Sequence, residues 1–295
     1  MGMKRAGRIM GVAGAALLGA GLAVSLHPPE DHTGLAALVE APRGSARMEA
    51  AETLAPVFDV RLPGDYQWAE EGTRELLARC WRRLHRLYGV APPYQWQVSY
   101  EPSIGPARYD LPALPLYDGQ GRLRLSVDYL AAPPGDDRWA QADTLGTLEG
   151  LAYGYHEYLG LDRTDLSEGL AAVTARDLGA TLWGGLRAGE LNALILVFED
   201  REANTVRYWR EQGRPPEGME SPTWERQRAI ACWREVGAGM SAEAWRLFFA
   251  GLTDRERPLT RVADSRQGNR LVAETLRRVT GRDCAQVFRD YGYEL

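Results

Sequence analysis

Hydrophobic positions in the first part of the chain follow two different periods. Between residues 68 and 88, apolar side chains recur every three or four positions, which predicts an amphipathic helix. These side chains are Leu76, Leu77, Cys80, Trp81, Leu84, Leu87 and Tyr88. Apolar and polar residues then alternate over 95–101 and 121–129, which predicts two strands. The pattern therefore indicates a leading helix followed by a small sheet.

From residue 140 onward the apolar spacing is mostly helical, and glycines follow several of the periodic stretches, where helices are expected to end. The helices predicted in this half cover residues 140–159, 166–182, 188–212, 222–236, 241–251, 268–279 and 283–290. A small N-terminal sheet with a leading helix, followed by a mainly helical half, predicts an α+β fold. We divide the expected domain, 57–295, into an α/β part at 57–139 and a helical part at 140–295.

The N-terminal residues 1–26 carry the pattern of an export signal. Three positive charges precede an uncharged run over residues 9–26 that is rich in Ala, Gly, Leu and Val. Its length fits either a cleaved signal peptide or a helix that anchors the protein in a membrane. Because the positive end stays inside, both alternatives place the remaining chain in the periplasm or on the extracellular face of the membrane. Residues 27–56, rich in Pro and Gly, predict a flexible linker.

Composition and charge narrow the classes of partner. The 295 residues are 45% hydrophobic and 25% charged, which is ordinary for a globular protein. The net charge is −5 without a long block of like charge, so no nucleic-acid partner is expected. Four arginines fall mostly on the polar side of the predicted 68–88 helix, which fits either a solvated face or an anion-binding patch. They are Arg79, Arg82, Arg83 and Arg86.

The three cysteines, Cys80, Cys232 and Cys284, lie far apart in the sequence. None has the close spacing of a cysteine zinc site. In an oxidising compartment one pair could form a disulfide and leave the third thiol free. Alternatively, all three are small buried residues on helices. The sequence leaves both alternatives open.

Two short phrases in the helical half place a Glu beside small residues. Residues 147–152 read Thr-Leu-Glu-Gly-Leu-Ala, and residues 166–171 read Leu-Ser-Glu-Gly-Leu-Ala at the start of the next predicted helix. With the order of the elements, these phrases resemble the gluzincin, or peptidase-MA-like, metallopeptidases, in which a Glu before Gly-Leu-Ala begins the third-ligand helix. The tail at 276–291 is similar to the family's closing helix pair, in which a glycine turn precedes a short last helix.

The resemblance implies a zinc peptidase site, but this chain lacks the two histidines that such a site needs. In the family, the first helix carries His-Glu-x-x-His, whose histidines bind zinc and whose Glu takes a proton from the zinc-bound water. By position, Glu149 corresponds to that general base and Glu168 to the third ligand. Leu148 and Ala152 occupy the two histidine positions, and neither side chain binds zinc. The resemblance therefore implies the fold without the family's hydrolysis.

A displaced set of ligands is the alternative. His156 begins the phrase His-Glu-x-x-Gly, in which Gly160 stands where a second His would be needed. On a helix, His156 shares a face with Glu149, seven positions earlier. Glu149, His156 and Glu168 would then surround a zinc ion as a carboxylate–imidazole–carboxylate set. Each residue also has an ordinary structural explanation. His156 fits a histidine satisfied by a local hydrogen bond, Glu168 an acid in the first turn of a helix, and Glu149 a polar position beside the former cleft.

These observations lead to two functional expectations. The first is an exported or membrane-anchored, non-catalytic metallopeptidase-like domain that binds a protein or peptide, as an accessory subunit of a membrane complex if residues 9–26 remain attached. No cofactor is expected under this interpretation. The second is an active zinc-dependent peptidase with the displaced ligands Glu149, His156 and Glu168, and zinc is expected only in that case.

Overall fold

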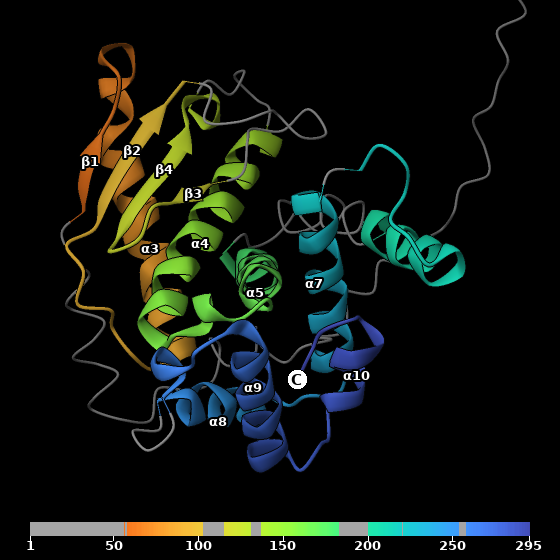
Figure 1. The fold of residues 1–295 in the computed structure, drawn as a ribbon. Helices are drawn as coiled ribbons and strands as arrows, with labels where there is room; N and C mark the ends of the chain where they lie inside the picture. The colour runs from red at the N-terminus through yellow and green to blue at the C-terminus, as the bar shows by residue number, and fades with distance from the viewer. Residues whose placement is uncertain are drawn as a thin grey trace, which may run out of the picture. The chain divides into compact units, whose positions relative to one another are not determined.

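The computed structural model describes residues 56, 58–102, 115–130, 137–182, 200–219, 221–253 and 258–295 (Figure 1). A small sheet comes first and helices follow, so the predicted α+β class is confirmed. The predicted signal or anchor at 1–26 and nearly all of the predicted linker at 27–56 lie outside the described residues. Within the described part, no helix has both the length and the apolar character that crossing a membrane requires.

The sheet has four strands in the order β1-β2-β4-β3. Their bounds are β1 (Asp59–Arg61), β2 (Gln97–Glu101), β3 (Leu116–Tyr117) and β4 (Arg122–Ser126). Strand β2 pairs in parallel with both β1 and β4, and its Val98 lies opposite Leu123. Strand β3 forms the edge and runs antiparallel to β4.

One face of the sheet is apolar and the other is polar, as the alternating sequence predicts. Val98, Tyr100, Leu123 and Leu125 are buried on the covered face. On the opposite face, Arg124 forms ion pairs with Glu101 and Asp118, and all three side chains are more than a third exposed. Charged pairs of this kind keep the open face in water.

The sheet differs from the sequence prediction in two additional strands and in the end of a predicted one. Strands β1 and β3 were not predicted, because each is too short to show an alternating pattern. The predicted strand 121–129 is wrong at its end, where residues Val127–Tyr129 form the 3-10 helix η2. The hydroxyl of Ser126 accepts a hydrogen bond from the backbone N–H of Asp128 and turns the chain there.

The leading helix is split into two parts. A 3-10 turn, η1 (Gly64–Ala69), precedes α3 (Glu70–Tyr88), which contains nearly all of the predicted 68–88 helix. Gly89 ends it with a φ of 69°, a left-handed conformation that glycine adopts without the strain of a Cβ. The apolar side of α3 packs on β1 and on helix α4 (Asp137–Leu159).

Glycines allow helix α4 to approach the sheet closely. A Cβ added at Gly150 would lie 2.4 Å from Cδ1 of Leu123, and one at Gly154 would lie 2.3 Å from Cη2 of Trp96. Real Cβ atoms do not come so close to other heavy atoms. The Gly-x-x-x-Gly spacing of α4 therefore sets the height of this helix above the sheet.

The remaining helices follow the predicted order. They are α5 (Ser167–Leu182), α7 (Ser221–Gly237), α8 (Ala242–Leu252), α9 (Ser265–Thr280) and α10 (Ala285–Asp290). The predicted 188–212 helix is helical over residues 200–212, and its first part lies outside the described residues. Cys80, Cys232 and Cys284 are all buried, and each is a free thiol.

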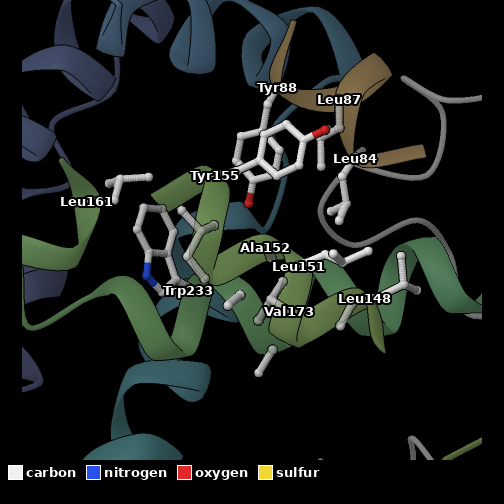
Figure 2. Packing of buried hydrophobic residues seen from close by; sticks show 14 of the residues in the cluster. Leu84, Leu87, Tyr88, Leu148, Leu151, Ala152, Tyr155, Leu161, Val173 and Trp233 are labelled. Atoms are coloured by element: carbon white, nitrogen blue, oxygen red, sulfur yellow. The ribbon is translucent and has the colours of Figure 1, made fainter. Parts of the chain in front are cut away.

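A continuous hydrophobic core joins the sheet to the helices. Figure 2 shows side chains of α3 (Tyr88), α4 (Tyr155), α5 (Val173) and α7 (Trp233) within this core. Trp233 also donates a hydrogen bond of 2.8 Å from its indole nitrogen to the backbone oxygen of Leu166, so its polar atom is satisfied in the interior.

Candidate functional site

Helices α4, α5 and α7 bring the residues of the candidate site together. Helix α5 packs on both α4 and α7. A Cβ added at Gly169 would lie only 2.3 Å from the backbone carbonyl carbon of Ala229 on α7. The glycine of the Ser-Glu-Gly-Leu-Ala phrase therefore allows α7 to approach α5 closely. Arg226 lies on α7 one turn before Ala229, so this close approach brings Arg226 toward α4.

The carboxylate of Glu149 is held by a guanidinium and a phenol. Arg226 donates one hydrogen bond of 2.8 Å from Nη2 to Oε2 and a second from Nη1 to Oε1. Tyr153, one turn further along α4, donates a 2.7 Å hydrogen bond to Oε1. Only 8% of the Glu149 side chain and 11% of the Arg226 side chain are exposed. This is a buried, bidentate ion pair, the strongest geometry for such a contact.

Glu168 also interacts electrostatically with Arg226 in this cluster. Burial disfavours the charged form of Arg226, but the negative charges around it outweigh burial and raise its pKa. Glu149 is the main source of that charge, and Glu168 also contributes. Burial and then Glu149 raise the pKa of Tyr153 well above its ordinary value, so its hydroxyl stays protonated as a donor. The structure therefore brings Glu168, exposed in the first turn of α5, close to the Glu149–Arg226 pair.

The two positions at which the family resemblance expects histidines belong to the hydrophobic core. Leu148 and Ala152 are fully buried. Figure 2 shows them on α4 together with Leu151, among apolar side chains of α3 and α5. Histidines there would have to turn out of a packed interior before they could reach a metal ion.

His156 lies in a different surrounding from Glu149. Its ring is fully buried, with Nε2 2.7 Å from the hydroxyl of Tyr88 and Nδ1 2.9 Å from the hydroxyl of Ser167. Burial lowers its pKa from 6.5 to about 3, so the ring is neutral at physiological pH. Both nitrogens are engaged in hydrogen bonds, and neither is left to bind a metal ion.

The residues present do not fit a zinc site of the family type. Among the residues that the structure describes, no three His, Cys, Asp or Glu side chains form a group that could hold a metal ion. The guanidinium of Arg226 occupies both oxygens of Glu149, and its charge would repel a cation placed there. The structure brings Glu149 and Glu168 together around an arginine, and it places His156 elsewhere.

A second polar cluster lies further toward the start of α4. The Oδ1 atom of Asp143 is 3.4 Å from the hydroxyl of Tyr100 and 3.5 Å from that of Thr147. Burial raises the pKa of Asp143 from 3.8 to about 7, and these two hydroxyls offset part of that effect. Asp143, Glu149 and Arg226 all act electrostatically on Tyr129, which is thus within electrostatic range of both clusters.

Two members of the site, Tyr153 and Arg226, are not among the residues predicted from the sequence. Tyr153 stands four positions after Glu149, a spacing that brings side chains together on a helix, so this contact had a sequence signal. Arg226 is separated from Glu149 by 77 positions, and nothing in the sequence links the two. Only the packing of α7 on α5 brings them together.

Comparisons of this chain with protein-family models, with curated proteins and with solved structures find no match. The geometry of the site is therefore the basis for a functional proposal.

Proposed function

We propose that this protein is an exported or membrane-anchored, non-catalytic domain that resembles gluzincin peptidases and binds a protein or peptide. The observation that carries the proposal is the ion pair between Glu149 and Arg226. A general base needs a lone pair directed at the proton that it removes. Both oxygens of Glu149 accept hydrogen bonds from Arg226, and one also accepts from Tyr153.

The order of the elements supports the proposed resemblance. Helix α3, the sheet, α4 with Glu149 and α5 with Glu168 follow one another as the resemblance implies. Helix α9 ends at Gly281, in a left-handed conformation, before the short last helix α10. A domain that keeps this architecture without metal ligands would use its surface for binding. With residues 9–26 in place as an anchor, it would serve as an accessory subunit of a membrane complex.

The displaced-ligand alternative requires several rearrangements. His156 would have to give up its hydrogen bonds to Tyr88 and Ser167, and Glu149 would have to leave Arg226. Breaking a buried ion pair by removing one partner costs about 3–5 kcal/mol. The binding of zinc would have to offset this cost and the loss of the histidine's hydrogen bonds.

Metal content and hydrolysis test the non-catalytic proposal directly. The full chain is dialysed against trace zinc, its zinc is measured by elemental mass spectrometry, and its activity is assayed on a fluorogenic peptide library. We expect neither stoichiometric zinc nor hydrolysis. About one zinc per chain that disappears with His156→Ala or Glu168→Gln, together with hydrolysis that Glu149→Gln abolishes, would establish the peptidase instead.

Photo-crosslinking tests the binding part of the proposal. A photo-reactive amino acid is placed at position 168, beside the candidate site, or at position 277, an exposed position on α9, as the matched control. In the native source, we expect position 168 to give one discrete, reproducible adduct that the control does not give. The same adducts from both positions, or none from either, would count against a partner at this site.

A further inference from the structure

Helix α3 has a row of arginines on the side away from the core. Its buried side chains include Leu77, Leu84 and Tyr88, which face the sheet and α4. The arginines at i, i+3, i+4 and i+7 fall together on the opposite face, over two helical turns. They are Arg79, Arg82, Arg83 and Arg86, and we call them the α3 arginine row. Arg79 is exposed and the other three are partly exposed.

Three arginines of the row are not held in ion pairs as other arginines of this fold are. Arg74, earlier on α3, pairs with Glu70, and Arg124 on the open sheet face pairs with two acids. In contrast, no side chain or backbone group in the described ranges forms a hydrogen bond or ion pair with Arg79, Arg82 or Arg83. A protein with a net charge of −5 thus presents four arginines over two turns of α3, beginning one turn after the exposed Glu75.

We propose that the α3 arginine row docks this domain on anionic phospholipid headgroups at a membrane surface. Guanidinium groups match phosphate oxygens through paired hydrogen bonds, which ammonium groups do not provide. The row lies on the outer face of a helix, a shape suited to an extended anionic surface. The net negative charge of the protein would repel its other faces from such a surface, so the row also fixes the orientation of the domain.

The sequence supplies the reason for choosing a membrane over a soluble anion. Residues 9–26 have the composition of an export signal or anchor, and about thirty residues separate this run from the folded domain. If this run stays in place as an anchor, a tether of this length keeps the domain near the membrane at a high effective concentration. Each arginine near an anionic surface strengthens association about fivefold, which is weak alone but sufficient to orient a tethered domain.

Arginine footprinting on the full chain tests the proposal. The protein is reconstituted in vesicles of phosphatidylcholine alone or mixed with phosphatidylglycerol, and treated with a glyoxal reagent that modifies exposed arginines. Peptide mass spectrometry then gives the reaction rate at each position. We expect Arg79, Arg82 and Arg83 to react about fivefold more slowly in the anionic vesicles at low salt, and to recover at high salt. Arg214, Arg261 and Arg277, which are exposed elsewhere, should react equally in both.

A pair of variants with equal net charge separates a local site from a general charge effect. The test variant combines Arg79→Gln, Arg82→Gln and Arg83→Gln, and the control combines Arg214→Gln, Arg261→Gln and Arg277→Gln. Energy transfer from tryptophan to a dansyl-labelled lipid reports how closely the domain approaches the bilayer. We expect the increase caused by phosphatidylglycerol to disappear in the test variant and to remain in the control.

Three results would overturn the proposal. Equal reaction rates in neutral and anionic vesicles would show that the row does not touch the lipid. Equal loss of energy transfer in both triple variants would show that net charge alone is responsible. Protection of the row by soluble heparin but not by anionic vesicles would assign it to a soluble polyanion and reject the membrane.

Discussion

Glu149 and Arg226 are each largely removed from water, with 8% and 11% of their side chains exposed. Buried charges are tolerated only when they form an ion pair with an opposite charge and when hydrogen bonds satisfy both groups. Tyr153 provides one of these bonds, at 2.7 Å from Glu149. At the residue scale, the candidate site is therefore a closed set of contacts, and the stability of the protein should depend on the set as a whole.

A double-mutant cycle measures this dependence. We expect Arg226→Met to lower the free energy of unfolding by about 3–5 kcal/mol, because Glu149 remains as an uncompensated buried charge. Glu149→Leu in the same chain should restore much of that loss, since the double variant leaves no charge behind. Urea titrations followed by circular dichroism give the values. Arg246→Met, which breaks an exposed pair with Glu243, is the control and should change stability little. Additive losses at Glu149 and Arg226 would contradict the proposed coupling.

The buried ring of His156 predicts a loss of stability in acid. Its pKa is about 3 in the folded protein and 6.5 in the unfolded chain, where burial no longer disfavours the charge. Below pH 6.5 the unfolded chain binds the extra proton, so stability falls as the pH decreases toward 3. The slope from this group approaches about 1.4 kcal/mol per pH unit. Urea unfolding between pH 7 and pH 4 should show a shallower slope for His156→Gln than for the wild type; equal slopes would refute the assignment.

Asp143 predicts an effect of opposite sign. Burial raises its folded pKa to about 7, above the 3.8 of the unfolded chain. The stability associated with its protonated form is complete below pH 3.8 and is lost as the pH rises through 7. At pH 8, the free energy of unfolding of Asp143→Asn, measured by urea titration, should therefore exceed that of the wild type by on the order of 2–4 kcal/mol. At pH 4 the two free energies should be nearly equal. A difference that does not change with pH would show that Asp143 does not titrate in this range.

At the scale of elements, glycines decide how closely the helices approach their neighbours. Gly150 and Gly154 lower α4 onto the sheet, and Gly169 brings α7 against α5. Gly72, on the exposed side of α3, has no atom within 4 Å of its added Cβ position. Replacing glycine by alanine should thus lower stability at Gly150 and Gly169 and raise it at Gly72.

Glycine-to-alanine variants test this difference. We expect Gly150→Ala and Gly169→Ala to lower the free energy of unfolding by about 1–3 kcal/mol each, because a methyl group must displace packed atoms. Gly169→Ala should also weaken the Glu149–Arg226 pair, since it pushes α7 outward. Gly72→Ala is the matched control and should raise stability by about 0.5–1 kcal/mol through helix propensity. Thermal unfolding of the three variants gives the comparison, and destabilisation by Gly72→Ala would argue against it.

At the scale of the whole molecule, the two sequence-defined parts, 57–139 and 140–295, share their interior. Tyr88 of α3 contacts Tyr155 of α4, with ring centroids 5.0 Å apart, and also Phe249 of α8, at 4.5 Å. Helix α3 thus lies in the sheet-containing part of the sequence, 57–139, but packs against helices of the part 140–295. A boundary in composition and element type is not a boundary in the core.

This shared core predicts that the two parts unfold together. Urea transitions followed by far-ultraviolet circular dichroism and by tryptophan fluorescence should coincide at one midpoint. A fragment ending at residue 139 should not fold, because the apolar faces of α3 and the sheet would remain exposed. Two separated transitions, or a cooperatively folded fragment, would show that the parts are independent domains.

Local sequence patterns are sufficient to predict the type and order of most elements. The hydrophobic face of α3 and the alternation through Val98 and Tyr100 show which surfaces are buried. This does not depend on which element packs against them. The sequence also showed that Leu148 and Ala152, at the two positions where the proposed resemblance expects histidines, cannot bind zinc. These properties are local, so a short stretch of sequence contains them.

The contacts of the remaining polar residues depend on tertiary packing. Glu149 has an arginine partner 77 positions away, and His156 meets Tyr88, 68 positions away, because packed helices bring them together. The two-residue strand β3 pairs with β4 without any alternating pattern of its own. Contacts between distant positions depend on how closely helices approach, and side chains on several elements set that distance jointly. No single segment of the sequence contains that information.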